Sequence, residues 1–548
     1  MKPIAFARHG RLPPPTVLAA ALALGLPLAA HAEEVAPSWP LSGERHDQVT
    51  PLKAQREALR RLRRADAPAG GASRTVANCD DDGPGSLRAE VAAAADGDRI
   101  DLSALTCSRI TLTTGAIEIE VDDLTLSGPG RGRLVIDGSG SQDRVLIHFG
   151  SGDLVIEDLT IANGHPISSG TRIGYGGCIA SVENVVLTRS TVSGCTAQGV
   201  GSYGGGILAE RLTMRQSTLS GNVAFGDHPT NSTAAYGGGA FVYEVDIQDS
   251  TIAGNQARGT YNPPLTRWEI GGGLFIAGGG TIERTTIEHN LSYLYGGGLA
   301  NEDDVIVRNS TVSGNVARDG DGGGLRIRRF TSLLLENSTV TDNSAGTGGG
   351  GISFARYARA STLRSSIVAG NTAPIAAQAD LTAAEPLPIG GSHNLVRRAS
   401  GLLQLPADTL DADPMLQPLA ANGGYGRTHA FTMHSPLYNR GENSAGLGSD
   451  QRGDPWRRDV GGAPDIGAFE LQRDPTPAAP VPALSTWAAA LLAGLLAWSG
   501  RRRYARAAAL TVPRRVAAPA SPDRSAVRCR VESAADASIC SGSANRHR

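Results

Sequence analysis

A glycine triplet that recurs along the middle of the chain constrains the fold more than any other sequence feature. The triplets, with Gly-Gly-Cys in the first, begin at positions 176, 204, 237, 271, 296, 322 and 348. The intervals between them range from 25 to 34 residues. Internal repeats of roughly 20 to 50 residues are typical of architectures in which each copy buries its apolar face against its neighbours. We therefore expect a stack of similar units at 176–371.

Each copy contains short runs with the period of a β-strand. The run from Ser310 to Ser313 alternates small polar and β-branched residues. A copy with an interval of 25 residues has room for three such strands with turns between them. Parallel strands joined in one sense are overwhelmingly right-handed. The sequence therefore predicts an all-β fold, a right-handed parallel β-helix that forms a single-stranded solenoid.

Most copies end on an asparagine. These end residues are Cys195, Asn222, Asn255, Asn290, Asn315, Asn343 and Asn371. Asn tolerates a left-handed backbone, and its amide can hydrogen-bond along a stack of coils, so we expect an asparagine ladder at one corner. Length variation is confined to the stretch between this residue and the next triplet. The longest inserts, 223–236 and 256–270, should protrude side by side.

Composition and charge narrow the classes of protein to which this chain can belong. Aromatic residues make up only 5% of the chain and 70 residues are glycine, which argues against a conventional globular core. The hydrophobic share of 40% is too high for a disordered chain. Residues 33–500 hold 37 basic and 50 acidic residues, a net charge near -13. Nucleic-acid binding depends on clustered Lys and Arg, so nucleic acid is excluded as the main partner.

The N-terminus has the order of a secretory signal peptide. Basic residues precede an apolar run from Val17 to Leu28 and the sequence Ala30-His31-Ala32, which fits an A-x-A cleavage site. We assign 1–32 to a signal peptide and 33–75 to a linker with a short basic helix. The protein is therefore expected to be exported.

Four cysteines form two local pairs in the predicted exported part of the chain. Cys79 and Cys107 lie near each other in the sequence, and so do Cys178 and Cys195. In an oxidising compartment both pairs could be disulfides, although a buried free thiol is the alternative for the second pair. No C-x-x-C sequence occurs, so we expect no zinc site.

Residues 76–175 are expected to form an N-terminal cap and the first coils. Ser86 followed by LRAEVAAAA predicts an N-capped short helix that could cover the open end of the solenoid. The segment Gly85 to Glu90 resembles the export-associated CSLREA motif, with the cysteine of the motif displaced to Cys79.

The repeat decays after Asn371. We expect a linker or degenerate coils at 372–410. The following 60 residues, 411–470, contain a series of short motifs. These are Asp413-Pro414, Leu416, Pro418-Leu419, Asn422-Gly423-Gly424, Thr428-His429, Ser435-Pro436, Asp450-Gln451-Arg452-Gly453 and Asp465-Ile466-Gly467-Ala468-Phe469-Glu470. In this order they resemble the choice-of-anchor Q domain.

The C-terminal part of the chain resembles an IPTL-CTERM sorting signal. A Pro/Ala linker at 471–482 leads into an apolar segment at 483–503 that ends in three arginines. Its apolar length is at the short limit for a transmembrane helix, and the arginines predict a cytoplasmic C-terminus. We expect a disordered tail at 504–548. The resemblance implies the cell envelope or surface of a Gram-negative bacterium, with the protein membrane-anchored or processed by a sorting protease.

The repeats also resemble those of polymorphic outer-membrane proteins and of pectate-lyase-like β-helices. Some proteins of that architecture cleave polysaccharides, with Ca²⁺-binding carboxylates or with acids that stack together. Acids recur six to eight residues after several triplets, at Glu183, Glu210, Glu244 and Asp304. They are either solvated turn residues or a catalytic or cation-binding stripe. The sequence indicates no cofactor and no metal site, with Ca²⁺ left open.

A tyrosine precedes four of the triplets. These residues are Tyr175, Tyr203, Tyr236 and Tyr295, and the neighbouring inserts contain Tyr261 and Trp268. An aromatic row beside polar loops could stack sugar rings, or it could be a structural ladder that supports the corner.

The leading hypothesis is a non-enzymatic envelope protein that presents the β-helix for adhesion or for binding glycans or matrix. The alternative is a polysaccharide lyase or hydrolase that uses the acidic stripe. A third hypothesis is a structural spacer that holds another module away from the membrane. Fold alone does not decide between them.

Overall fold

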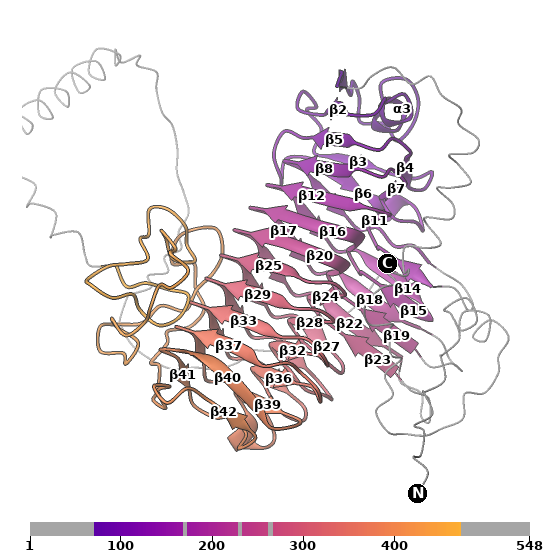
Figure 1. Cartoon of the computed structure of the whole chain (residues 1–548). Coiled ribbons are helices and arrows are strands. Elements are labelled where there is room, and N and C mark those ends of the chain that lie inside the picture. The colour runs from indigo at the N-terminus through magenta and orange to yellow at the C-terminus, as the bar shows by residue number, and fades with distance from the viewer. Residues whose placement is uncertain (1–70, 168–172, 228–232, 261–266, 473–548) are drawn as a thin grey trace, which may run out of the picture. The chain divides into compact units, whose positions relative to one another are not determined.

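The computed structural model describes residues 71–167, 173–227, 233–260 and 267–472. These residues are nearly all β, and their strands pair in parallel from one coil to the next. The coils stack from α3 (Leu87–Ala92) at the N-terminal end to β42 (Leu403–Gln404) (Figure 1). This arrangement is compatible with the predicted parallel β-helix.

Several predictions fall on residues that the structure does not describe. They are the signal peptide, the short basic helix, Tyr261, the C-terminal apolar segment and the tail. Among the described residues, no helix has the length and hydropathy needed to cross a membrane.

The largest sheet has 21 strands and forms one wall of the solenoid. It consists of two columns of short strands, which β16 and β20 join because each of these is nine residues long and pairs with both columns. Its strands are β1 (Ser73–Thr75), β2 (Asp98–Asp101), β4 (Ile117–Ile119), β5 (Leu124–Ser127), β7 (Leu146–His148), β8 (Asp153–Glu157), β11 (Ile179–Ser181), β12 (Asn184–Thr188), β16 (Ile207–Arg215), β20 (Ala240–Gln248), β24 (Leu274–Ile276), β25 (Gly280–Glu283), β28 (Leu299–Asn301), β29 (Val305–Arg308), β32 (Leu325–Ile327), β33 (Leu333–Glu336), β36 (Ile352–Phe354), β37 (Ser361–Arg364), β39 (Leu381–Ala383), β40 (Leu387–Ser392) and β42.

The second wall is a sheet of 11 strands. It runs almost the full length of the described solenoid, with one short strand from each coil (Figure 1). Its strands are β3 (Arg109–Thr111), β6 (Val135–Asp137), β9 (Thr160–Ala162), β13 (Thr191–Ser193), β17 (Thr218–Ser220), β21 (Thr251–Ala253), β26 (Thr286–Glu288), β30 (Thr311–Ser313), β34 (Thr339–Thr341), β38 (Ile367–Val368) and β41 (Leu395–Val396).

Two smaller sheets form an arm at the corner where the sequence varies in length. The inserts lie side by side as expected, but part of each is paired strand, not loop. Ala224, Ala235 and Ala257 pack together as a small buried cluster in the arm. The strands of one sheet are β14 (Thr196–Gly199), β18 (Val223–Gly226), β22 (Gln256–Gly259), β27 (Leu291–Ser292), β31 (Val316–Ala317) and β35 (Ser344–Ala345), and those of the other are β10 (Gly174–Tyr175), β15 (Gly201–Tyr203), β19 (Thr233–Tyr236) and β23 (Arg267–Ile270).

The predicted N-terminal helix is present as α3. The Ser86 side chain accepts a hydrogen bond from the backbone of Ala89 and so caps the helix. Leu87 and Val91 are buried in the same apolar core as the first strands. Two short 3-10 helices, η1 (Gly138–Gly140) and η2 (Ala376–Gln378), also occur.

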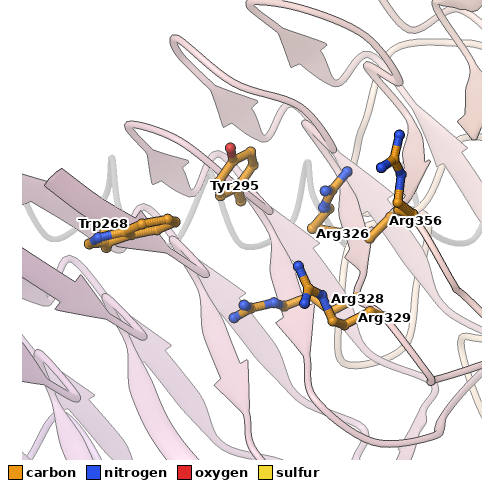
Figure 2. A pocket seen from close by; sticks show the side chains of 7 residues that line it. Trp268, Tyr295, Arg326, Arg328, Arg329 and Arg356 are labelled. Atoms are coloured by element: carbon orange, nitrogen blue, oxygen red, sulfur yellow. The ribbon is translucent and has the colours of Figure 1, made fainter. Parts of the chain in front are cut away.

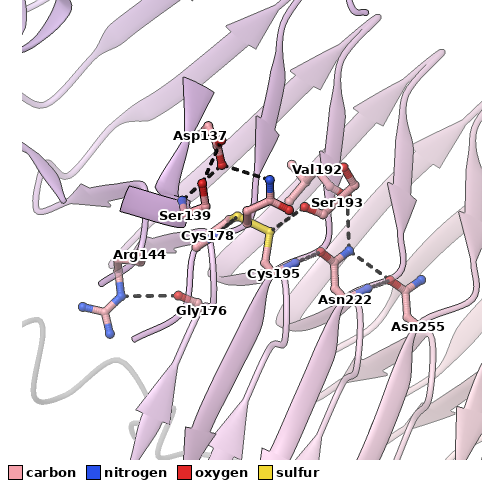
Figure 3. Close-up of a disulfide and its surroundings, with 12 residues drawn as sticks. Asp137, Ser139, Arg144, Gly176, Cys178, Val192, Ser193, Cys195, Asn222 and Asn255 are labelled. Atoms are coloured by element: carbon pink, nitrogen blue, oxygen red, sulfur yellow. Dashed lines mark hydrogen bonds between the residues drawn. A yellow bond between two sulfur atoms is a disulfide. The ribbon is translucent and has the colours of Figure 1, made fainter. Parts of the chain in front are cut away.

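The asparagine ladder is confirmed. Asn222 donates from its backbone and from its side-chain amide to Oδ1 of Asn255, at 3.0 and 2.9 Å (Figure 3). The same pattern continues coil by coil to Asn371, whose amides donate to Asp380. All these side chains are buried, so each rung gives hydrogen-bond partners to polar groups that cannot reach water.

One detail of the ladder was predicted wrongly. The left-handed backbone belongs to the residue before each asparagine, for example Gly221 (φ +64°), His289 (φ +52°) and Asp342 (φ +58°). The asparagine itself lies within the buried stack, where its amide has to point along the solenoid axis.

The first rung is replaced by a disulfide. Cys195 occupies the asparagine position, and its backbone N–H donates to Oδ1 of Asn222 at 3.1 Å. Its sulfur is bonded to Cys178, which stands where later coils have glycine (Figure 3). The other predicted pair, Cys79 and Cys107, is also a disulfide.

The triplets mark a corner where backbones of neighbouring coils approach closely. The first glycine has a positive φ, as at Gly204 (φ +70°), and a Cβ on the second, Gly205, would lie 2.1 Å from the carbonyl oxygen of Gly238 in the next coil. By the hydrogen bonds between coils, the seventh triplet begins at Gly349 (φ +60°) and not at Gly348.

Residues 411–470, which we call the C-terminal strap, pack on the outward face of the 11-stranded sheet. His429 Nε2 lies 2.9 Å from Ser313 Oγ, and the Ala468 backbone donates to Thr339 Oγ1 at 3.0 Å. The Asp-Gln-Arg-Gly and Asp-Ile-Gly-Ala-Phe-Glu motifs meet inside the strap, where the Arg452 guanidinium donates to Asp450 and to the Glu470 carbonyl, both at 2.6 Å. Burial raises the pKa of the Glu470 carboxyl to about 8. These motif residues therefore hold the strap together. The segment 372–410 contains β39 to β42, and β39, β40 and β41 pair in parallel with β36, β37 and β38 of the preceding coil.

Asn315→Ala should destabilise the solenoid by roughly 3 kcal/mol, because it leaves the buried backbone N–H of Asn290 without a partner. It also removes one of the two hydrogen bonds made by the Asn290 side-chain amide and one of the two accepted by the Asn343 side-chain oxygen. The midpoint of urea unfolding, followed by circular dichroism, measures the change. Gln404→Ala, at an exposed strand position, is the control and should leave the midpoint in place. Equal midpoints for the two variants would contradict a structural role for the ladder.

Candidate functional site

The four predicted acids do not form one column. The Glu210 backbone donates to the Glu183 carbonyl at 2.9 Å, so these two residues are neighbours in adjacent coils. In the next coil Glu244 is aligned with Arg211, one residue beyond Glu210, and is ion-paired with it. The number of residues between the triplet and the acid differs by one between coils. This difference places the acids in different columns, so they do not form the predicted stripe.

Asp304 is also engaged elsewhere. It lies 2.5 Å from Arg359 and accepts hydrogen bonds from the backbone and the hydroxyl of Ser332 at 2.7 and 2.9 Å. The described residues hold no cluster of three or more His, Cys, Asp or Glu side chains able to bind a metal ion. The arrangement of these acids therefore supports the solvated-turn alternative.

The tyrosine row is a stacked ladder inside the molecule. The rings of Tyr175 and Tyr203 have centroids 5.8 Å apart, and those of Tyr203 and Tyr236 are 5.2 Å apart. They lie on the face of the four-stranded sheet and pack against Phe241 and Phe275, which project outward from the large sheet. Tyr203 and Tyr236 are only 9% and 4% exposed, and burial raises the pKa of Tyr236 to about 12. Of the two alternatives for these rings, the structure therefore supports the structural ladder, because both are buried between the arm and the large sheet.

The C-terminal end of this row opens into a pocket. Ile270 takes the position after Tyr236, and Tyr295 follows Ile270. Trp268 and Tyr295 are half-buried and lie on one side of the pocket, opposite the side chains of several arginines (Figure 2). The lining residues are Trp268, Tyr295, Arg326, Arg328, Arg329, Ala355 and Arg356. The sequence predicted the two aromatic residues of this pocket but none of its arginines.

Carboxylates hold three of these arginines in place. Arg326 pairs with Asp321 at 2.7 Å, and its guanidinium carbon lies 5.1 Å from the centre of the Tyr295 ring. Arg328 pairs with Glu302. Burial raises the pKa of Glu302, and the charges of Arg328 and Arg329 oppose that rise. Arg356 pairs with Glu385 at 3.2 Å.

Two exposed aromatic rings lie next to the pocket residues in sequence. Phe330 follows Arg329, Tyr357 follows Arg356, and the two rings stack with centroids 5.8 Å apart and planes 6° from parallel. They are 47% and 54% exposed. Both have a left-handed backbone, with φ of +65° and +64°, and the Phe330 N–H donates to the Tyr357 carbonyl at 2.7 Å.

A left-handed backbone is unusual for bulky side chains, and it tends to persist where the residue has a function. We call Phe330, Tyr357 and the pocket residues together the arginine–aromatic face. The sequence carried a signal for the exposed pair, because each ring lies eight residues after the first glycine of its triplet once the seventh triplet is counted from Gly349.

Among known proteins, no family model and no curated sequence matches the chain. The assignment of a function therefore depends on the geometry of the face and on the sequence patterns described above.

Tyr236→Ala should destabilise the protein by about 3 kcal/mol, because it empties buried space between Tyr203 and Phe275. Tyr357→Ala should leave stability nearly unchanged, because the ring is exposed. Thermal unfolding of the two variants measures this difference. If Tyr236→Ala unfolded at the temperature of the unaltered protein, the row would not be a structural ladder.

Proposed function

We propose that this chain is an exported cell-envelope protein whose right-handed parallel β-helix binds glycans at the arginine–aromatic face, without catalysis. The observation that carries the proposal is the stacked, exposed Phe330–Tyr357 pair, whose residues directly follow two arginines that line a pocket of aromatic and guanidinium groups. Exposed aromatic rings give a flat apolar surface on which a sugar ring can lie, and the polar groups beside them fix its orientation.

The location is proposed from the sequence. The signal-peptide pattern, the CSLREA-like segment, the choice-of-anchor Q-like motifs and the IPTL-CTERM-like end all favour export and then anchoring or processing at the envelope of a Gram-negative bacterium. Helix α3, as a cap on the open end of the solenoid, would protect its first edge strand from pairing with other chains.

The enzyme alternative has less support. A lyase or hydrolase needs acids that converge on one substrate, and Glu183 and Glu210 lie in a different column from Glu244, which is paired with Arg211. The rigid coils place loops and exposed rings on a fixed surface, which suits a binding protein better.

A glycan array with the full-length protein tests this function. We expect binding that Tyr357→Ala weakens by roughly ten-fold or more, because truncation of a central aromatic contact removes a large share of the binding free energy. Met433→Ala, which removes an exposed apolar side chain from the C-terminal strap, is the control and should leave binding intact.

The same wells are assayed for released unsaturated or reducing sugar. If the unaltered protein released product and Glu244→Ala did not, the chain would be an enzyme and the proposal of a non-catalytic binding protein would be wrong. Binding that Tyr357→Ala does not change would remove the face from the proposal.

A further inference from the structure

We propose that the pocket binds the carboxylate or sulfate group of an acidic saccharide whose sugar ring lies on Phe330 and Tyr357. This inference rests on the proposed glycan-binding function and names the class of ligand. The argument depends on the donors that line the pocket, on the way its arginines are held, and on its size.

The polar side chains that line the pocket are almost entirely hydrogen-bond donors. Four are guanidiniums, which only donate, and Trp268 offers one indole N–H. The Tyr295 hydroxyl is the one lining side chain that can also accept. No carboxylate side chain lines the pocket among the described residues. A ligand must therefore supply acceptors, and the planar oxyanions of a carboxylate or the oxygens of a sulfate match guanidinium donors in pairs.

The acids near the pocket position its arginines and leave donors for a ligand. Glu302 and Glu385 pair with Arg328 and Arg356, and neither acid lines the pocket. A guanidinium has five N–H donors, so a pair with one carboxylate does not use them all. Because the side chains are already held, less rotamer freedom is lost when a ligand binds.

The size of the pocket indicates that the charged group of the ligand enters it while the sugar ring stays outside. The cavity volume is about 40 Å³, whereas a single water needs at least about 10 to 15 Å³. The pocket thus accommodates one oxyanion but not a whole ring. Phe330 and Tyr357 directly follow the lining residues Arg329 and Arg356 in sequence, so the backbone that carries the exposed stacked rings continues from the backbone that carries two of the pocket's arginines. An acidic sugar has both parts that this arrangement needs.

Calorimetric titration of the full-length protein tests the inference with three probes. They are a uronic-acid tetrasaccharide, the same tetrasaccharide with its carboxyl groups reduced to alcohols, and sodium sulfate. We expect the acidic form to bind about ten-fold tighter than the reduced form, and Arg356→Gln to remove most of this difference. Added salt should weaken the acidic form more than the reduced one.

Arg364→Gln is the matched control. Arg364 is a half-exposed arginine that is also paired with a glutamate, Glu336 at 3.3 Å, but it lies on β37 and does not line the pocket. This variant should bind both oligosaccharides as the unaltered protein does. Competition by sulfate against the acidic form alone would support the inference.

The outcomes separate this inference from the proposed function. Equal binding of the two tetrasaccharides, weakened by Tyr357→Ala but not by Arg356→Gln, would overturn the acidic ligand and keep a glycan-binding protein. Binding of neither tetrasaccharide, together with binding to vesicles of acidic phospholipid, would overturn both.

Discussion

The hydrogen bonds that join each coil to the next are the interaction on which the rest of this structure depends. A single coil buries little apolar surface and leaves its backbone donors and acceptors unpaired, so it becomes stable only in a stack. The asparagine ladder carries this pairing into the core, since from Asn255 to Asn371 Oδ1 of each asparagine accepts two bonds from the coil before it. The backbone N–H of the disulfide-bonded Cys195 donates to Asn222 at the first rung, and the carboxylate of Asp380 accepts from Asn371 at the last.

The same stacking places outward-facing residues in columns. The site lies where two of these columns change from aromatic to smaller or charged residues. On the arm, the column of tyrosines passes through Ile270 to Tyr295. On the large sheet, the column of Phe241 and Phe275 passes through Ala300 to Arg326. Toward the N-terminus the aromatic rings of the two columns pack against one another. Toward the C-terminus smaller and charged residues leave a pocket with arginines along one side (Figure 2).

The repeat predicted the parallel coils, the ladder and the corner that varies in length, because these follow from periodicity alone. The columns outside the solenoid were harder to predict. A difference of one residue between coils moves an acid out of its column, as at Glu244, and spacing to the triplet does not reveal such a shift. The burial of Tyr203 and Tyr236 depends on how the arm folds back over the large sheet, which local pattern does not encode. A second ladder of hydroxyl side chains, Ser217, Ser250, Thr285 and Ser310, joins the coils at another corner. It was missed because serine and threonine are also ordinary turn residues.

Hydrogen–deuterium exchange of the full-length protein, with and without a mixture of acidic oligosaccharides, tests the central claim most directly. The account predicts slow exchange throughout the stacked coils, with added protection on ligand binding at 326–330 and 355–359. Protection that appeared instead around Glu183 and Glu210, with no change at those two segments, would contradict a binding site at the arginine–aromatic face.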